Sequence, residues 1–174
     1  DEPVRAGRDG WTFRSRSGIA PQFSDISVLA GLPGLSALSL SRCTRVTDLA
    51  PLSPLVQLHV LRLRGCDGLG CLAGLRGLPD LRELTLSWCT GITSIKPLGD
   101  LPALAWLDLE FCRELVRLDG LERLHALASL DMAECISLAG LEPLRGLSSL
   151  RRLQAGFCGP LGRFDPIVGL LPAL

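Results

Sequence analysis

Residues 81–89 read Leu-Arg-Glu-Leu-Thr-Leu-Ser-Trp-Cys, and this nine-residue phrase returns throughout the chain. The same pattern, Leu-x-x-Leu-x-Leu-x-x-Cys, fills residues 35–43, 58–66 and 104–112. Two later copies end at Cys135 and Cys158, with Met132 and Ala155 at the third apolar position. The cysteines therefore recur every 23 residues, at Cys43, Cys66, Cys89, Cys112, Cys135 and Cys158. A fixed period of this length predicts a repeat architecture in which each unit packs on its neighbours.

The apolar spacing within one repeat predicts its local structure. After Cys89 the apolar residues are Ile92, Ile95, Leu98, Leu101, Leu104, Leu107 and Leu109. The spacing of two between Leu107 and Leu109 is that of a strand, whereas the spacing of three elsewhere suits turns or 3₁₀ segments. The eighth residue after each cysteine is proline or glycine, which forbids a long regular helix there. We therefore predict an α/β-type repeat solenoid: a right-handed coil with a parallel β-sheet on one face, about 4.8 Å per rung, and turns or 3₁₀ segments on the other.

The two ends of the chain depart from this pattern. Residues 1–22 lack the spaced leucines, so they are the candidate N-terminal cap or flanking segment, with one strand expected near residues 11–15. The solenoid itself is assigned to residues 23–174. Because Leu174 lies within the opening of another repeat, we expect the repeats to continue beyond this chain. No signal-like apolar segment follows Asp1.

Composition excludes several classes of partner. Hydrophobic residues make up 47% of the chain, yet no stretch approaches the roughly 18 uninterrupted apolar residues of a membrane-spanning helix. The 18 basic and 18 acidic residues cancel, so the chain lacks the positive field on which non-specific nucleic-acid binding depends. Asparagine is absent, which removes the acceptor for N-glycosylation and disfavours a secreted ectodomain. We expect an intracellular, cytoplasmic protein without nucleic-acid partners or membrane insertion.

The repeats resemble those of the leucine-rich repeat superfamily over about residues 23–174. Residues 46–52, Val-Thr-Asp-Leu-Ala-Pro-Leu, resemble the short repeat of internalins and phosphatase regulators, and residues 89–95, Cys-Thr-Gly-Ile-Thr-Ser-Ile, are similar to repeats of kinetoplastid proteins. The resemblance implies a curved protein-binding scaffold without catalytic residues of its own. Cysteine stands where the bacterial internalins carry asparagine, so adhesion to a host receptor is not carried over.

Three interpretations compete for the regularly spaced cysteines, which we call the cysteine ladder: structural thiols, disulfides and metal ligands. Thiols are small, readily buried and weakly hydrogen bonding, so they suit the tight turn after each strand. Neighbouring rungs fall within disulfide range, but an in-register stack points the side chains in parallel. Tetrahedral zinc ligands must instead converge on the ion. We favour structural thiols; Cys71 lies off the ladder and is either a plain surface cysteine or a reactive thiol.

The sequence contains no catalytic constellation that we can trace. His59 and His125 are the two histidines, and they occupy non-equivalent positions two repeats apart, where solvated surface residues are expected. Residues 68–70, Gly-Leu-Gly, lack the ending of a phosphate-binding loop. We predict that the chain is not an enzyme and requires no cofactor.

The variable positions on the outer face of the strands are the candidate binding surface. The aromatic candidates, expected within about 10 Å of one another on adjacent rungs, are Trp88, Trp106 and Phe111. The acidic candidates beside them are Asp108, Glu110, Asp131 and Glu134, and the basic candidates to either side are Arg62, Arg64 and Arg152. Aromatic anchors with a charged rim are typical of a protein-binding hot spot. The alternative is that Trp88, Phe111 and Phe157 cover the strand-to-turn edge as packing.

Three functions remain open at this level. The first hypothesis is a non-catalytic scaffold for protein–protein interaction that binds its partner on the strand-lined face. The alternatives are the substrate-recognition arm of a larger enzyme complex, such as a ubiquitin ligase or a phosphatase, and a structural component of a large assembly. No motif identifies the partner.

Overall fold

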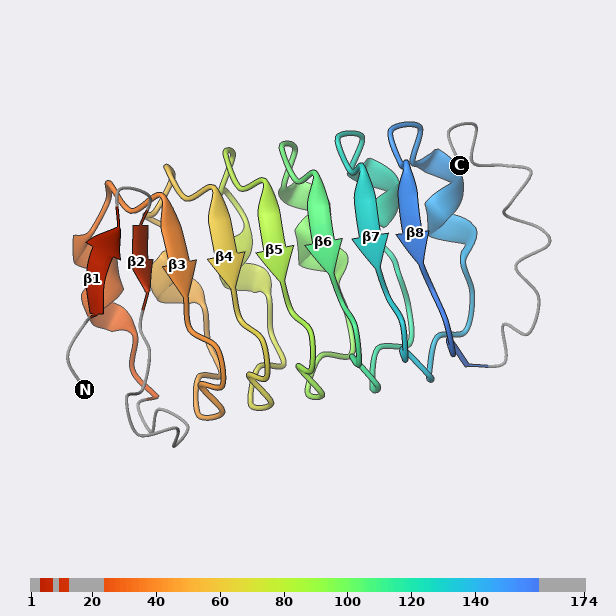
Figure 1. Cartoon of the computed structure of the whole chain (residues 1–174), viewed down its shortest axis with the longest axis horizontal. Helices are drawn as coiled ribbons and strands as arrows, with labels where there is room; N and C mark the ends of the chain where they lie inside the picture. The colour runs from red at the N-terminus through yellow and green to blue at the C-terminus, as the bar shows by residue number, and fades with distance from the viewer. Residues whose placement is uncertain (1–3, 8–9, 13–23, 160–174) are drawn as a thin grey trace.

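The chain forms a solenoid whose strands lie side by side on one face, with short helices behind them (Figure 1). The structure is a computed structural model and describes residues 4–7, 10–12 and 24–159. Eight strands form one sheet in chain order: β1 (Val4–Gly7), β2 (Gly10–Thr12), β3 (Ala37–Ser39), β4 (Val60–Arg62), β5 (Glu83–Thr85), β6 (Trp106–Asp108), β7 (Ser129–Asp131) and β8 (Arg152–Gln154). The predicted repeat solenoid with a parallel sheet on one face is confirmed.

Strand register follows the repeat. From β3 to β8 each strand is parallel to the next, and paired residues are one repeat apart, as in Leu84 with Leu107. The central leucine of each strand from β3 to β7 is buried, and Thr85, at an outer position of β5, is buried as well. The strand β2 is parallel to β3, and β1 is antiparallel to β2. The strand expected near residues 11–15 thus begins at Gly10 and is described to Thr12; residues 13–23 and 160–174 lie outside the described residues.

Short 3₁₀ helices occupy the other side of each coil. They are η1 (Ser27–Gly31), η2 (Ala50–Leu52), η3 (Ala73–Leu75), η4 (Lys96–Asp100), η5 (Leu121–Arg123) and η6 (Glu142–Gly146). Proline lies in the first turn of η2, η4 and η6, where its missing N–H is not needed. In η3 the equivalent residue is Gly74, and a Cβ there would overlap the backbone of Leu49 in the preceding coil. Proline and glycine thus keep the helices short and the coils close.

One continuous core runs the length of the solenoid. The apolar residues of the repeat are almost all buried, and so are the six ladder cysteines. Leu107 on β6 is fully buried, whereas its neighbours Trp106 and Asp108 are half-buried on the outer side. The predicted division into inside and outside positions is therefore confirmed along β6, and it places the variable residues on the sheet's exposed face.

Candidate functional site

The turn after each strand imposes an unusual backbone conformation on the residue before the cysteine. At all six equivalent positions φ lies between 59° and 69°: Arg42, Gly65, Trp88, Phe111, Glu134 and Phe157. The left-handed conformation costs a residue other than glycine roughly 1–2 kcal/mol. Because all six positions adopt this conformation, the geometry of the turn requires it whichever residue stands there. We call these six residues the edge column.

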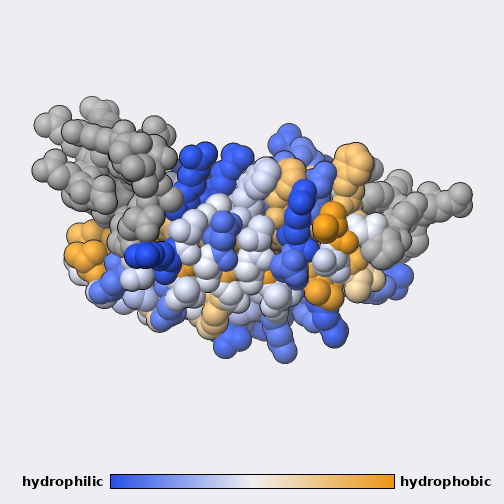
Figure 2. All heavy atoms as spheres, turned by 90° about the horizontal axis from the view of Figure 1, so that it is seen from below, coloured by the Kyte–Doolittle hydropathy of each residue, from blue (hydrophilic) through white to orange (hydrophobic). Residues whose placement is uncertain are grey.

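The left-handed turn also extends the hydrogen bonding between rungs beyond the strands. The Trp88 N–H donates to the Glu110 carbonyl at 2.8 Å, and the Phe111 N–H donates to the Ala133 carbonyl at 2.8 Å. These bonds continue the hydrogen bonding of the sheet into the edge column, so its side chains project from a hydrogen-bonded backbone. Figure 2 views this edge, at which the strands end, and shows hydrophilic and hydrophobic side chains gathered in alternating groups along it.

Two of the three predicted aromatic anchors meet in the edge column. The rings of Trp88 and Phe111 stack with centroids 3.9 Å apart and an interplanar angle of 16°. The Arg113 guanidinium lies 5.3 Å from the centre of the Phe111 ring and forms an ion pair with Glu134 at 3.5 Å. Trp88 remains 41% exposed. The result is a preformed aromatic platform that is still open to solvent.

Trp106 does not join this platform. It begins β6, paired in register with Glu83 and Ser129, and it lies five residues before Phe111 at the opposite end of the strand. Among the described residues, Trp88 with Phe111 is the one pair of rings that stacks. The three aromatic candidates therefore form two sites on the face, separated by Asp108 and Glu110.

The acidic candidates lie on the face between these aromatic sites. Asp108 and Asp131 are paired in register, and each uses Oδ1 to accept the backbone N–H two residues later at 3.0 Å. Burial, followed by the negative charge of Asp131, raises the pKa of the Asp108 carboxyl, which also accepts a hydrogen bond from the buried Ser87. Burial and the charges of both aspartates raise the pKa of Glu110 as well. Among the described residues, Asp108, Glu110 and Asp131 form no ion pair, so the repulsion among these carboxylates is offset only in part, by the charge of Arg64.

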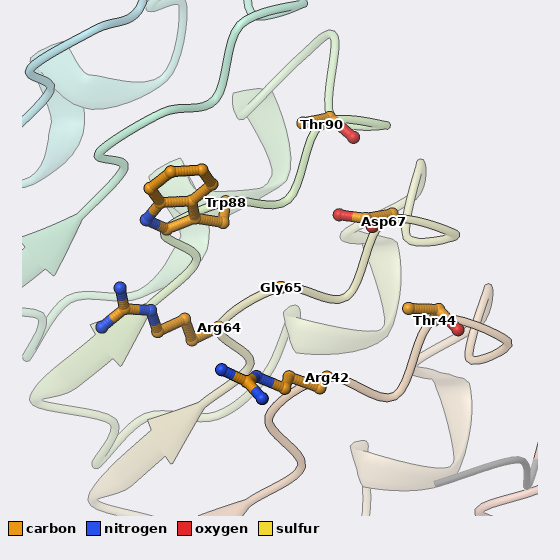
Figure 3. Close-up of a pocket in the computed structure, with 7 residues that line it drawn as sticks. All are labelled: Arg42, Thr44, Arg64, Gly65, Asp67, Trp88 and Thr90. Atoms are coloured by element: carbon orange, nitrogen blue, oxygen red, sulfur yellow. The ribbon is translucent and has the colours of Figure 1, made fainter. Parts of the chain in front are cut away.

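The basic candidates are dispersed among different surroundings. Arg62 forms an ion pair with Glu83 at 3.5 Å, and Arg152 is exposed at the start of β8. Arg64 is exposed beside Gly65, and its positive charge opposes the rise in the pKa of Asp108 and Glu110. Arg64 also lines a hollow of about 510 Å³ at the turn edge (Figure 3).

The sequence alone does not predict this hollow. Gly65 lies at its centre, and Arg42 lies on the rung before it (Figure 3). The signal that could have revealed it is a single glycine in a column otherwise filled by large side chains.

The comparisons with known structures agree with this geometry. Internalin C2 from Listeria monocytogenes is similar with a TM-score of 0.74 and 27% identity, over 87% of this chain and 64% of that one. A leucine-rich repeat protein from Leptospira interrogans is similar with a TM-score of 0.62 and 23% identity, over 87% and 39%. The chain has a leucine-rich repeat fold. A chain of the mouse RP105/MD-1 complex is also similar, with a TM-score of 0.63 and 25% identity, over 79% and 25%.

This leucine-rich repeat chain thus spans less than two thirds of the length of each of these neighbours. No family model matches its sequence. No curated protein matches it either.

The cysteine ladder of this leucine-rich repeat protein is built from unpaired, buried thiols. From Cys66 onward, each ladder thiol donates a hydrogen bond to a backbone carbonyl of the preceding rung. The acceptor is the buried residue three positions before that rung's own cysteine, as in Cys89 Sγ to Leu63 O at 3.0 Å. That carbonyl also accepts the N–H of its own rung's cysteine, so the thiol occupies its second lone pair. Burial raises the pKa of the Cys112 thiol to about 12 and also raises that of Cys135. The ladder cysteines are buried and unpaired, as the structural interpretation predicted, and their hydrogen bonds also connect neighbouring rungs.

The remaining candidates for chemistry stay apart. Cys71 is exposed, His125 is exposed and His59 is half-buried. Within residues 4–7, 10–12 and 24–159, no group of three or more His, Cys, Asp or Glu side chains could hold a metal ion. No helix in the same ranges is long and apolar enough to cross a membrane.

Proposed function

We propose that this leucine-rich repeat chain is a non-catalytic scaffold that binds a protein partner on its strand-lined face. The observation that carries the proposal is the preformed aromatic platform of Trp88 and Phe111 beside the half-buried carboxylates Asp108 and Asp131. Aromatic side chains held rigidly before binding contribute contact area with little loss of conformational entropy. Carboxylates with uncompensated charge favour a partner that brings positive charge.

The edge column adds a second argument. Trp88, Phe111 and Phe157 adopt a left-handed backbone that glycine would adopt at lower cost. Packing on the core does not account for them, because Trp88 is 41% and Phe157 82% exposed. Trp88 and Phe111 do cover each other, so part of the packing interpretation holds. The exposed remainder of the platform is what we assign to partner binding, with Trp106 as a second anchor.

The proposed partner surface has a defined composition. Its aromatic members are Trp88, Trp106 and Phe111, its acidic members are Asp108, Glu110, Asp131 and Glu134, and its basic members are Arg62, Arg64 and Arg152. The similar chain from mouse belongs to a complex of two named proteins, RP105 and MD-1, which supports a protein partner for this fold.

We also propose an intracellular, cytoplasmic location. The support is that all seven cysteines are unpaired and six of them are buried, as expected in a reducing compartment. For protein purified from its own cells without reductant, alkylation after unfolding should label all seven thiols. Fewer labels would mean that disulfides form in the cell and would contradict the location.

The proposed function is tested by Trp106→Ala in a pull-down from an extract of the source cells. Removing an aromatic anchor typically costs about 2 kcal/mol or more, which is roughly thirtyfold in affinity. Circular dichroism and thermal unfolding of the same variant establish that the fold is retained. Arg145→Ala, an exposed residue in η6, is the matched control and should capture the partner normally. Loss of thermal stability with unchanged partner binding would contradict the assignment of this face.

A further inference from the structure

The edge column contains one gap, at Gly65. Its neighbours one rung away are Arg42 and Trp88, both with exposed side chains. Glycine contributes no side chain between them, and the hollow of about 510 Å³ lies there, with the Gly65 backbone at its centre (Figure 3). The hollow is therefore a consequence of one residue type at one position of the repeat.

The two arginines beside the hollow form no ion pair among the described residues, and the charge of Arg64 is only partly offset by Asp108 and Glu110. Elsewhere on this face Arg62 is paired with Glu83, and Arg113 with Glu134. Among the described residues, no carboxylate oxygen lies within 4.0 Å of the Arg42 or Arg64 guanidinium. Asp67 also lines the hollow, but Figure 3 shows both arginine side chains extending away from it. Two guanidinium groups and an indole thus flank the same empty space.

We propose that this hollow binds the carboxylate side chain of an aspartate or glutamate in the protein partner. The Arg42 and Arg64 guanidinium groups would donate to the carboxylate, a contact for which the guanidinium geometry is well suited. The indole of Trp88 forms one wall and packs against the methylene groups of the same side chain. This inference rests on the proposed function, because it names the chemistry by which part of the same face recognises its partner.

The position of the acidic cluster adds a spacing requirement. Asp108 and Asp131 lie on the second and third rungs after that of Gly65, which is roughly 10–14 Å along the axis of the solenoid at about 4.8 Å per rung. An extended segment advances about 3.3 Å per residue, so three or four residues cover that distance. The partner segment that fits has an acidic residue in the hollow and a lysine or arginine three or four residues away, over Asp108 and Asp131.

Two kinds of variant test the hollow without disturbing the core. The double variant Arg42→Gln/Arg64→Gln removes the charges of two exposed side chains. Gly65→Phe fills the space instead; Phe111 and Phe157 already occupy equivalent left-handed positions, and a Cβ on Gly65 would meet only Arg42, at 3.6 Å. Arg145→Gln is the matched control, because it removes one positive charge from η6 on the helical side.

The probe is a phage-displayed library of random, unphosphorylated dodecapeptides selected on the immobilised wild-type chain. We expect selected peptides to carry Asp or Glu with Lys or Arg three or four residues away. Synthetic copies should bind the double arginine variant and Gly65→Phe about tenfold to a hundredfold more weakly than wild type, and bind Arg145→Gln normally. Replacing the peptide's acidic residue by its amide should weaken binding to wild type by a similar factor and to the arginine variant hardly at all.

Peptides without an acidic residue, undiminished binding to the hollow variants, or a library that yields no binder would each overturn the proposal. If the selected peptides bind the hollow variants as tightly as wild type but bind Trp106→Ala more weakly, the strand-lined face still binds protein and only the hollow is misassigned. If the natural partner is unaffected by Trp106→Ala, the proposed function itself fails.

Discussion

Leu107 shows how the place of a residue in the repeat determines whether its side chain is buried. Its side chain is fully buried and pairs in register with Leu84 and Leu130. Its two strand neighbours are half-buried on the outer side. One position therefore serves stability, and the next one along the chain is free to serve recognition.

Leu107→Ala should destabilise the protein by about 2–5 kcal/mol, because truncation leaves a cavity between tightly packed rungs. Chemical denaturation of the variant and wild type measures this difference. Ser129→Ala, on the outer side of β7, is the control and should change stability little. A denaturation midpoint unchanged by Leu107→Ala would mean that the assignment of inside and outside is wrong.

Asp108 is a residue whose charge works against folding. Burial raises its pKa in the folded protein above the value of the unfolded chain, so the folded state takes up a proton more readily. The contribution of this group to stability is therefore unfavourable at neutral pH and disappears as the pH falls through the raised pKa and below the ordinary value near 3.8.

Asp108→Asn should accordingly be more stable than wild type at pH 7, with a difference that shrinks as the pH is lowered. The amide oxygen still accepts the Glu110 N–H, so the turn keeps its hydrogen bond. Thermal unfolding from pH 3 to 8 on both proteins measures the effect, with Asp48→Asn, in an exposed turn, as control. A variant less stable than wild type at pH 7 would contradict the account.

At the scale of the element, the turn after each strand sets the geometry of the face. It holds six residues of five types at nearly the same φ and connects each rung to the next by backbone hydrogen bonds. The stacked pair of Trp88 and Phe111 is a product of this turn, because equivalent residues on adjacent rungs project in the same direction. The stack therefore stabilises the edge while leaving an aromatic surface exposed.

A double-mutant cycle on Trp88→Ala and Phe111→Ala should give a coupling free energy of about 0.5–1.5 kcal/mol, as for other aromatic pairs in contact. The measurement is the free energy of unfolding of the two single variants and the double variant. The cycle on Trp106→Ala and Phe111→Ala is the control, and its coupling should be near zero because those rings do not stack. Equal coupling in the two cycles would contradict the geometry.

At the scale of the whole molecule, the sequence predicts the solenoid and its core because the leucine period assigns every apolar residue to one side. It predicts the buried thiols for the same reason. It does not predict the left-handed edge column, since five residue types fill its six positions and only Gly65 carries a signal for positive φ. The aromatic cluster is predicted only in part: counting rungs brings Trp88 and Phe111 together, but Trp106 begins β6 whereas Phe111 lies in the turn after that strand.

The charge pattern of the strand-lined face is likewise predicted only in part from the sequence. The sequence places acidic residues among the aromatic ones, but the raised pKa of Asp108 depends on burial and on the register of Asp131. The hollow depends on a side chain that is missing. The raised pKa of Asp108 and the hollow at Gly65 both depend on contacts between neighbouring rungs, which the sequence of a single repeat does not reveal.

The central claim is that the strand-lined face, and not the helical side, contacts the partner. Hydroxyl-radical footprinting with and without the captured partner tests it directly, because oxidation reports the solvent exposure of each side chain. The account predicts that Trp88, Trp106 and Phe111 are oxidised more slowly in the complex, while Val28, 74% exposed in η1, reacts at the same rate. Protection of Val28 with unchanged oxidation of the three aromatic side chains would contradict it.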